Sequence, residues 1–193
     1  MTTPPRHEDD NAVIIANTVE WLEKAVIGLN LCPFAKAVHV KKQIRYVVCD
    51  SANPEELLAL LMDELQLLAD TSAEEIDTTL LIHPYALNDF LDYNEFLDVV
   101  EAAVEDLQLD GELQVASFHP QYQFAETFDD DISNFTNRSP YPTLHLLRED
   151  SIERAVEAFP EASEIFDRNI ATLEKLGLEG WQKLGLYQHK VAQ

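Results

Sequence analysis

Glycine, cysteine and basic residues are all scarce in this sequence, and each shortage excludes a class of protein. The five glycines form no GxGxxG, GxSxG or Gly-rich phosphate loop, which argues against a dinucleotide dehydrogenase, an α/β-hydrolase and a P-loop nucleotide enzyme. The two cysteines, Cys32 and Cys49, lack CxxC spacing, and two are too few for a disulfide framework.

The shortage of basic residues leaves the chain strongly acidic. Thirteen Lys and Arg face 36 Asp and Glu, so the formal net charge is −23. Such a surface repels nucleic acid, and we predict no nucleic-acid partner. The same field repels anionic substrates, so any anion site must carry its own cations. We interpret the one basic cluster, between Lys36 and Arg45, as a solvated loop followed by an edge strand.

Long hydrophobic runs are also missing. Apolar stretches such as residues 57–68 are interrupted by acids and are too short to span a bilayer. The N-terminal stretch MTTPPRHEDDN has no apolar core of the kind found in signal peptides. We therefore predict a cytoplasmic protein with no membrane partner. Residues 1–11 are expected to form a disordered lead, residues 12–184 a single α/β domain and residues 185–193 a C-terminal tail.

Hydrophobic periodicity alternates between the strand and the helix period along the chain. The pattern predicts an α/β fold of βαβαβ type, with a mostly parallel or mixed four-stranded sheet and helices packed on it. Strands are expected at residues 44–49, 77–83, 112–119 and 143–148. Helices are expected at residues 12–28, from 54 onward, at 89–109, from 150 to about 160, and at 162–176, where Gly177 would end the last one.

Two of the predicted strands end in the same dipeptide. His83 and His119 are each followed by proline, in LLIHPYAL and VASFHPQYQF. If the two strands are parallel neighbours, both histidines emerge at the carboxyl edge of the sheet. Open α/β sheets bind ligands at that edge.

The 24 residues from His119 to Pro142 contain no predicted element. Compact domains rarely tolerate so long a connection unless it is functional or disordered. Several aromatic side chains can anchor this one by burying their rings. We therefore predict a long ordered loop before the last strand, at an edge where sites are common.

Histidine is the residue type that points most directly to chemistry here. His83, His119 and His145 come from three different strands, and imidazole titrates near neutrality. We predict His119 as a general acid or base, with His83 or His145 assisting. The alternative is that each is a satisfied core or rim histidine. A metal triad is disfavoured because HxH and HExxH spacing are both missing.

Polar and aromatic residues at the end of the loop are candidate ligand-binding groups. In an acidic chain an arginine needs a partner, which is either a neighbouring carboxylate or a ligand anion. Asparagines beside it supply amide hydrogen bonds or close Asx turns. A tyrosine between two prolines is held rigidly and suits either a corner or a ligand wall. The candidates are Asn134, Asn137, Arg138, Tyr141 and Arg148.

Cys32 is the remaining catalytic candidate. It precedes a proline in LNLCPF and would be a nucleophile if one of the histidines paired with it. The alternative is a small buried hydrophobic residue.

Three separated stretches resemble one protein family. They are GLNLCPFAK (residues 28–36), FHPQYQFA (118–125) and NRSPYPTLHLLRE (137–149). The chain thus resembles, over most of its length, an uncharacterised bacterial family known as domain of unknown function 1415. The resemblance implies a small cytoplasmic protein and transfers neither an activity nor a catalytic residue.

Three functional hypotheses follow from the sequence. The first is a small-molecule site for an anionic metabolite at the carboxyl edge of the sheet, in an enzyme that uses histidine acid/base chemistry. The second is a non-catalytic ligand-binding or sensor domain with the same site. The third is an acidic protein-interaction module. The sequence names no cofactor and no metal site.

Overall fold

The computed structural model describes residues 8–158 and 164–189. Its centre is one four-stranded sheet with the order β1-β2-β4-β3. β1 and β2 are parallel, and β4 is antiparallel to both of its neighbours, so β1, β2 and β3 all run in one direction. The strands are β1 (Ile44–Val48), β2 (Thr78–Ile82), β3 (Leu113–Phe118) and β4 (Thr143–Arg148). The predicted mixed α/β fold is confirmed.

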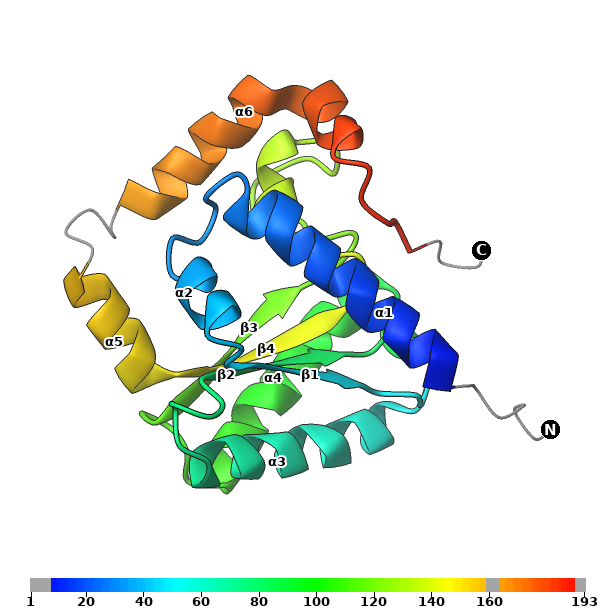
Figure 1. The fold of residues 1–193 in the computed structure, drawn as a ribbon. Helices are drawn as coiled ribbons and strands as arrows, with labels where there is room; N and C mark the ends of the chain where they lie inside the picture. The colour runs from blue at the N-terminus through cyan, green and yellow to red at the C-terminus, as the bar shows by residue number, and fades with distance from the viewer. Residues whose placement is uncertain (1–7, 159–163, 190–193) are drawn as a thin grey trace.

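Two long helices cover one face of the sheet (Figure 1). They are α3 (Pro54–Asp70) and α4 (Phe90–Asp106). Each begins after a capping side chain: Asn53 accepts a hydrogen bond from the backbone N–H of Glu55, and Asp89 accepts one from that of Leu91. An N-terminal cap satisfies amide groups that have no partner within the helix.

The main core lies between these helices and the sheet. Four leucines of α3 are completely buried there, and burying each such side chain contributes about 1.5–3 kcal/mol. They recur every three or four residues, so they lie on one face of the helix. These residues are Leu57, Leu61, Leu65 and Leu68.

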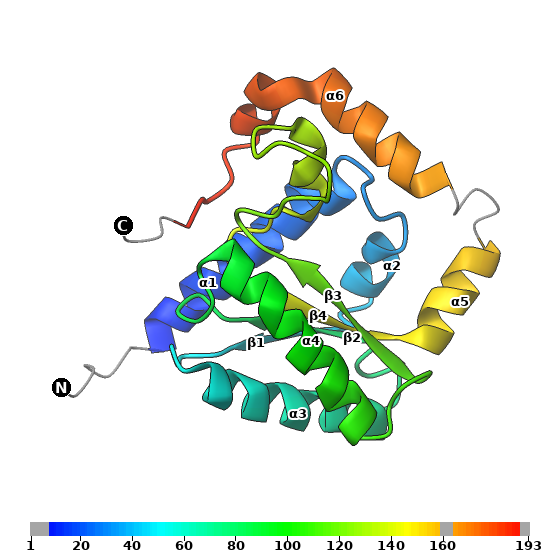
Figure 2. The same cartoon turned by 180° about the vertical axis from the view of Figure 1, so that it is seen from behind.

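The opposite face of the sheet is covered by the N-terminal helices and by α5 (Figures 1 and 2). α1 (Glu8–Trp21) runs directly into a π-helical turn, η1 (Leu22–Ile27). π-turns are rare and occur frequently at functional sites. A Cβ atom at Gly28, the residue after η1, would overlap the carbonyl oxygen of Lys24, so the tight turn requires glycine there.

One helix on this face was not predicted, and the predicted end of another cannot be compared. Residues Ala35–Val40 form α2, whereas the basic cluster beginning at Lys36 was interpreted as a loop; the edge strand after it is present as β1. α5 (Glu149–Ala158) starts directly after β4, and its predicted end near residue 160 lies outside the described residues. The predicted lead, residues 1–11, also falls mostly outside them, although residues 8–11 belong to α1.

The connection from His119 to Pro142 contains one short 3-10 helix, η2 (Ile132–Asn137). α6 (Ile165–Lys183) covers it, with the rings of Phe135 and Trp181 in edge contact at 5.1 Å. The predicted stop at Gly177 is confirmed, because this residue has φ 65°, a non-helical value that glycine tolerates, and it breaks α6 into two helical segments. The second segment, which continues to Lys183, was not predicted.

Candidate functional site

His83 and His119 lie at the same edge of the sheet but not on neighbouring strands. Ile82 and Phe118 both pair with Thr143, so β4 separates the two histidines. Both side chains are completely buried. Their rings pack against Tyr93 of α4, with centroid distances of 5.6 Å and 5.0 Å.

The ring nitrogens of these histidines bond mainly to backbone. Nδ1 of His83 donates to the carbonyl oxygen of Ala86 (3.0 Å), and its buried Nε2 has no partner among the described residues. In His119, Nδ1 accepts from the N–H of Gln121 (3.0 Å) and Nε2 donates to the carbonyl oxygen of Leu87 (3.2 Å). Burial lowers the pKa of both histidines to about 4, so both are neutral at pH 7.

His145 lies on the other face of the sheet. It sits in the middle of β4, where alternate side chains point to opposite faces, and its Nε2 lies 2.8 Å from the Thr78 hydroxyl. The three histidines therefore do not converge. Among the described residues no group of three or more His, Cys, Asp or Glu side chains is placed to hold a metal ion.

The hydrogen bonds around Thr78 determine which nitrogen of His145 carries the proton. The Thr78 hydroxyl lies 2.6 Å from the carbonyl oxygen of Leu146, and a carbonyl can only accept. The hydroxyl therefore donates to Leu146 and must accept from Nε2 of His145. Burial lowers the pKa of His145 to about 4, so the ring is neutral and Nδ1 keeps a lone pair.

The polar residues of the loop turn inward and hold the loop together. The side chain of Asn134 is completely buried; its oxygen accepts from the N–H of Phe124, and its amide donates to the carbonyl oxygen of Phe128. Asn137 donates to the carbonyl oxygen of Ser117. Arg138 donates to the carbonyl oxygens of Tyr122 and Asp129 and stacks on the ring of Phe135.

The last two candidate ligand residues are also engaged within the protein. The Tyr141 hydroxyl accepts a hydrogen bond from Asn17 of α1 (2.8 Å), and its ring stacks on Tyr187. The Arg148 guanidinium donates to three backbone carbonyl oxygens around the end of α3 and the start of β2. These belong to Leu68, Thr71 and Ile76.

Two adjoining cavities lie on the face of the sheet that carries His145. We call the first the inner chamber. It has a volume of about 340 Å³, lies between the sheet, η1, α2 and α5, and is lined mainly by apolar side chains. The lining includes Trp21, Leu22, Val26, Phe34, Phe118 and Leu147, together with Cys32, Thr78, His145 and Arg148.

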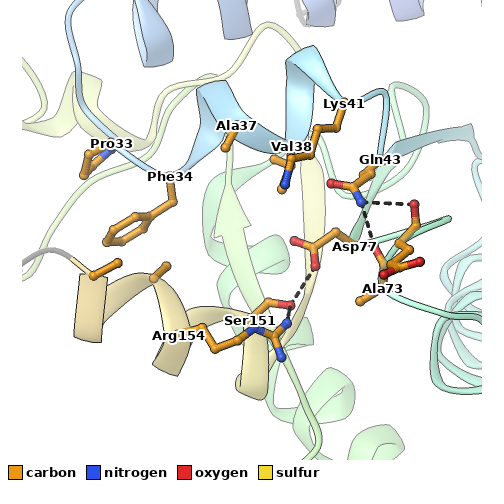
Figure 3. Close-up of a pocket in the computed structure, with 13 residues that line it drawn as sticks. Pro33, Phe34, Ala37, Val38, Lys41, Gln43, Ala73, Asp77, Ser151 and Arg154 are labelled. Carbon is orange, nitrogen blue, oxygen red and sulfur yellow. Dashed lines mark hydrogen bonds between the residues drawn. The ribbon is translucent and has the colours of Figure 1, made fainter.

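The second cavity, which we call the mouth, is larger and more polar. Its volume is about 510 Å³, and it shares five lining residues with the inner chamber: Phe34, Val38, Asp77, Ser151 and Ala155. Figure 3 labels charged residues from three segments, Lys41 after α2, Asp77 before β2 and Arg154 on α5. Glu74 also lines the mouth. The mouth therefore lies where β1 and β2 begin, at the edge opposite to His83 and His119.

A chain of hydrogen bonds crosses the mouth (Figure 3). Arg154 donates to the hydroxyl of Ser151 (3.0 Å), which donates to the carboxylate of Asp77 (2.6 Å). α5 has no buried residue of its own. The Ser151–Asp77 bond consequently ties α5 to the start of β2, while the Arg154–Ser151 bond lies within α5.

Cys32 lines the inner chamber, on the same side of the sheet as His145. Burial raises the pKa of the Cys32 thiol, although backbone N–H groups of Phe34 and Ala35 partly offset this. No hydrogen bond between Cys32 and a histidine occurs in the described residues. A thiol that stays protonated at pH 7 is a weak nucleophile.

A family model described as a protein of unknown function (DUF1415) matches residues 13–183. The chain belongs to this family. The resemblance drawn from the three sequence stretches is thus confirmed, and every residue that lines the two cavities falls within the DUF1415 range. No curated protein and no solved structure shows a significant match to the chain. Within the described residues no helix is long and apolar enough to cross a membrane.

Sequence reasoning missed most residues that line the cavities of this DUF1415 domain. It set Lys41 aside as part of a solvated loop and assigned no role to Asp77, Ser151 or Arg154. Two signals pointed to them. The only basic cluster of an acidic chain lies beside the mouth, and the helix after β4 carries small and apolar residues on one face at Ile152, Ala155 and Ala158.

Proposed function

We propose that this protein binds a small organic anion with an apolar body, which occupies the mouth and the inner chamber. The charge of the lining carries the proposal. Three of the chain's 13 basic residues line the two cavities, but only two of its 36 acids, Glu74 and Asp77, do so. A molecule with net charge −23 repels anions, so an anion site needs local cations, and the cavity lining is enriched in them.

Lys41 and Arg154 are the cations best placed to hold the anionic group. The N–H groups of Arg148 already donate hydrogen bonds to backbone carbonyl oxygens. Lys41 is exposed, and no ion pair is recorded for it in the part of the chain that the structure describes. Arg154 uses one nitrogen for Ser151 and has further N–H groups to offer. Charge-assisted hydrogen bonds from such groups are about twice as strong as neutral ones.

The inner chamber suits the apolar body of the ligand. Its volume lies within the usual range for small-molecule sites, ~300–1,000 Å³. Its lining is largely hydrocarbon and aromatic, so transferring an apolar group there from water is favourable. The π-helical turn η1 contributes Leu22 and Val26 to this lining.

The protonation states support binding without turnover. A general base works best with a pKa near the operating pH, whereas burial lowers the pKa of His145 to about 4. A nucleophilic cysteine needs a lowered pKa, whereas burial raises that of Cys32. Of the three functional hypotheses, these protonation states favour a non-catalytic ligand-binding domain, but its proposed site lies at the edge of the sheet opposite to the predicted carboxyl edge.

Calorimetry with matched ligands tests this function. 3-Phenylpropanoate and octanoate should bind, whereas 3-phenylpropylamine and octylamine should bind at least tenfold more weakly. The double variant Lys41→Gln/Arg154→Gln should lose about tenfold in affinity for the acids, since two charge-assisted contacts are removed. Lys36→Gln is the matched control, because Lys36 is exposed on α2 and does not line either cavity.

Cysteine alkylation reports independently on occupancy of the inner chamber. A bound acid should slow alkylation of Cys32, while Cys49, which is 3% exposed and lies on the other side of the sheet in the main core, serves as the reference. Equal binding of acids and amines, or binding that leaves Cys32 reactivity unchanged, would contradict the proposal.

A further inference from the structure

We infer that His145 selects, among organic anions, those that carry a hydroxyl group at the end of the apolar body remote from the acid. This inference rests on the proposed function and names the ligand class more closely. The inference rests on two features: which ring nitrogen of His145 carries the proton, and the position of this residue in the lining of the inner chamber.

The acceptor on His145 is fixed by its neighbours. The Thr78 hydroxyl donates to the carbonyl oxygen of Leu146, so Nε2 of His145 donates to Thr78 and Nδ1 retains its lone pair. Within residues 8–158 and 164–189 no group forms a hydrogen bond with Nδ1. This nitrogen is also not one of the completely buried polar atoms that lack a partner. Because His145 is half-buried and lines the inner chamber, the chamber is where this lone pair is accessible.

Three polar side chains of the inner chamber lie at its mouth end: Asp77 and Ser151, which also line the mouth, and Arg148, the last residue of β4. At the inner end few groups can form a hydrogen bond with a ligand. The Thr78 hydroxyl already gives its proton to Leu146. The Cys32 thiol is a weak donor and a weak acceptor. Most of the other side chains are apolar, with the rings of Trp21 and Phe118 in edge contact at 5.3 Å. At this inner end, a ligand group that donates a hydrogen bond therefore finds its best acceptor at Nδ1 of His145.

The acceptor and the cations lie at opposite ends of the site. His145 is in the middle of β4, whereas Arg154 lies on α5 after the end of that strand. A strand rises ~3.4 Å per residue, so about 10 Å of β4 separate His145 from Arg148, the last residue of the strand before α5. The matching ligand is an acid whose hydroxyl lies on the order of 10 Å from the carboxylate, as in a hydroxyaryl alkanoate or an ω-hydroxy fatty acid.

Burial makes this contact selective. A wholly apolar ligand end would remove water from Nδ1 without replacing the hydrogen bond, and an unpaired buried acceptor is unfavourable. Sites built to bond a hydroxyl therefore discriminate strongly against analogues that lack it. We expect at least tenfold tighter binding of the hydroxylated acid.

Matched pairs of acids test the inference. The pairs are 3-(4-hydroxyphenyl)propanoate with 3-phenylpropanoate, and 8-hydroxyoctanoate with octanoate. 3-(4-Methoxyphenyl)propanoate is the third aryl probe, since it has the oxygen but no proton to donate. The hydroxylated acids should bind at least tenfold more tightly than their partners, and the methoxy compound should bind no better than 3-phenylpropanoate.

Two further measurements assign the effect to His145. His145→Phe should abolish the preference for the hydroxyl while the unsubstituted acids still bind. In the wild-type protein, the ¹⁵N resonance of His145 Nδ1 should be that of an unprotonated nitrogen and should shift when the hydroxylated acid binds, but not with the methoxy compound. If His145→Phe does not fold, this spectrum and the wild-type affinities decide the matter.

These experiments distinguish a failure of the proposed function from a failure of the role inferred for His145. If neither the hydroxylated nor the unsubstituted acids bind, the proposed function is wrong. If all of them bind with equal affinity, the anion site stands and the role of His145 is overturned. A protonated Nδ1 in the free protein, or a hydroxyl preference that persists in His145→Phe, would also overturn it.

Discussion

The Ser151 hydroxyl donates a 2.6 Å hydrogen bond to the carboxylate of Asp77. Asp77 precedes β2 and Ser151 lies in the first turn of α5, so this bond fastens a helix without buried residues over the two cavities. A side-chain hydrogen bond of this kind contributes about 1 kcal/mol, and more when the acceptor is charged. The bond therefore influences how often α5 moves away from the inner chamber.

Ser151→Ala should make the inner chamber more accessible. Losing the bond should raise the population of open states about three- to tenfold, and the alkylation rate of Cys32 should rise by the same factor. Mass spectrometry after timed alkylation measures this, with Cys49 as the internal reference. Ser133→Ala, in η2 and away from both cavities, should leave the rate unchanged. An unchanged Cys32 rate in Ser151→Ala would show that other contacts hold α5 in place.

Asn134→Ala should destabilise the long loop. Its side chain is completely buried and bonds to Phe124, Thr127 and Phe128, so alanine leaves several buried polar groups unpaired. The expected loss is about 2–4 kcal/mol in the free energy of unfolding, measured with urea. Hydrogen exchange should quicken first at the amide of Phe124. Asp130→Ala, an exposed change in the same loop, is the control and should alter stability by less than ~0.5 kcal/mol.

Stability should fall as the pH drops below neutrality. Burial lowers the pKa of His83, His119 and His145 to about 4 in the folded protein, whereas in the unfolded chain each titrates near ~6.5. Between these values the unfolded state binds more protons, so stability present above pH ~6.5 is lost on going down to pH ~4, at up to ~1.4 kcal/mol per pH unit for each histidine.

Urea unfolding between pH 7 and pH 5 measures this slope. Because Phe cannot take up a proton, His145→Phe should lower the slope by up to ~1.4 kcal/mol per pH unit, whatever it does to stability at pH 7. If the free energy of unfolding changes with pH in the same way in the variant and the wild type, burial does not keep His145 neutral.

The ion pair between Arg45 of β1 and Glu64 of α3 should stabilise the folded protein. Glu64 of α3 is 5% exposed, and Arg45 of β1 binds both of its oxygens, at 2.7 Å and 2.9 Å. Arg45→Met leaves a buried carboxylate unpaired and should lower the free energy of unfolding by about 1–3 kcal/mol. Arg45→Met/Glu64→Leu should recover most of the loss, because no charge then remains buried. The exposed pair Lys183–Glu179 provides the comparison, since Lys183→Met should change stability by less than ~1 kcal/mol.

The fold was largely predictable because its signals are local. The cap at Asn53, the leucine spacing of α3 and the apolar strands each specify an element within a few residues. The sequence did not reveal that β4 inserts between β2 and β3. Strand order depends on contacts between residues far apart in the chain, and the βαβαβ pattern is compatible with more than one arrangement.

The candidate site was predicted less well. The polar residues of the loop stand out in the sequence, but the structure shows Asn134 and Arg138 bonded to the loop's own backbone. An isolated side chain does not show whether its partner is a ligand or a carbonyl group. The residues that line the mouth form no sequence motif. Their possible role is visible only in the structure, where three separate segments bring Lys41, Asp77 and Arg154 together.

By itself the sequence determined the four strands and most of the helices, the mixed α/β class, the acidic composition and the family, because these follow from composition, spacing and local motifs. Only the tertiary structure decided which face each histidine occupies, where the cavities lie and which nitrogen of His145 carries the proton. The reason is physical: a burial state or a tautomer is set by groups such as Thr78 and Leu146, which reach their partner only after the strands have paired.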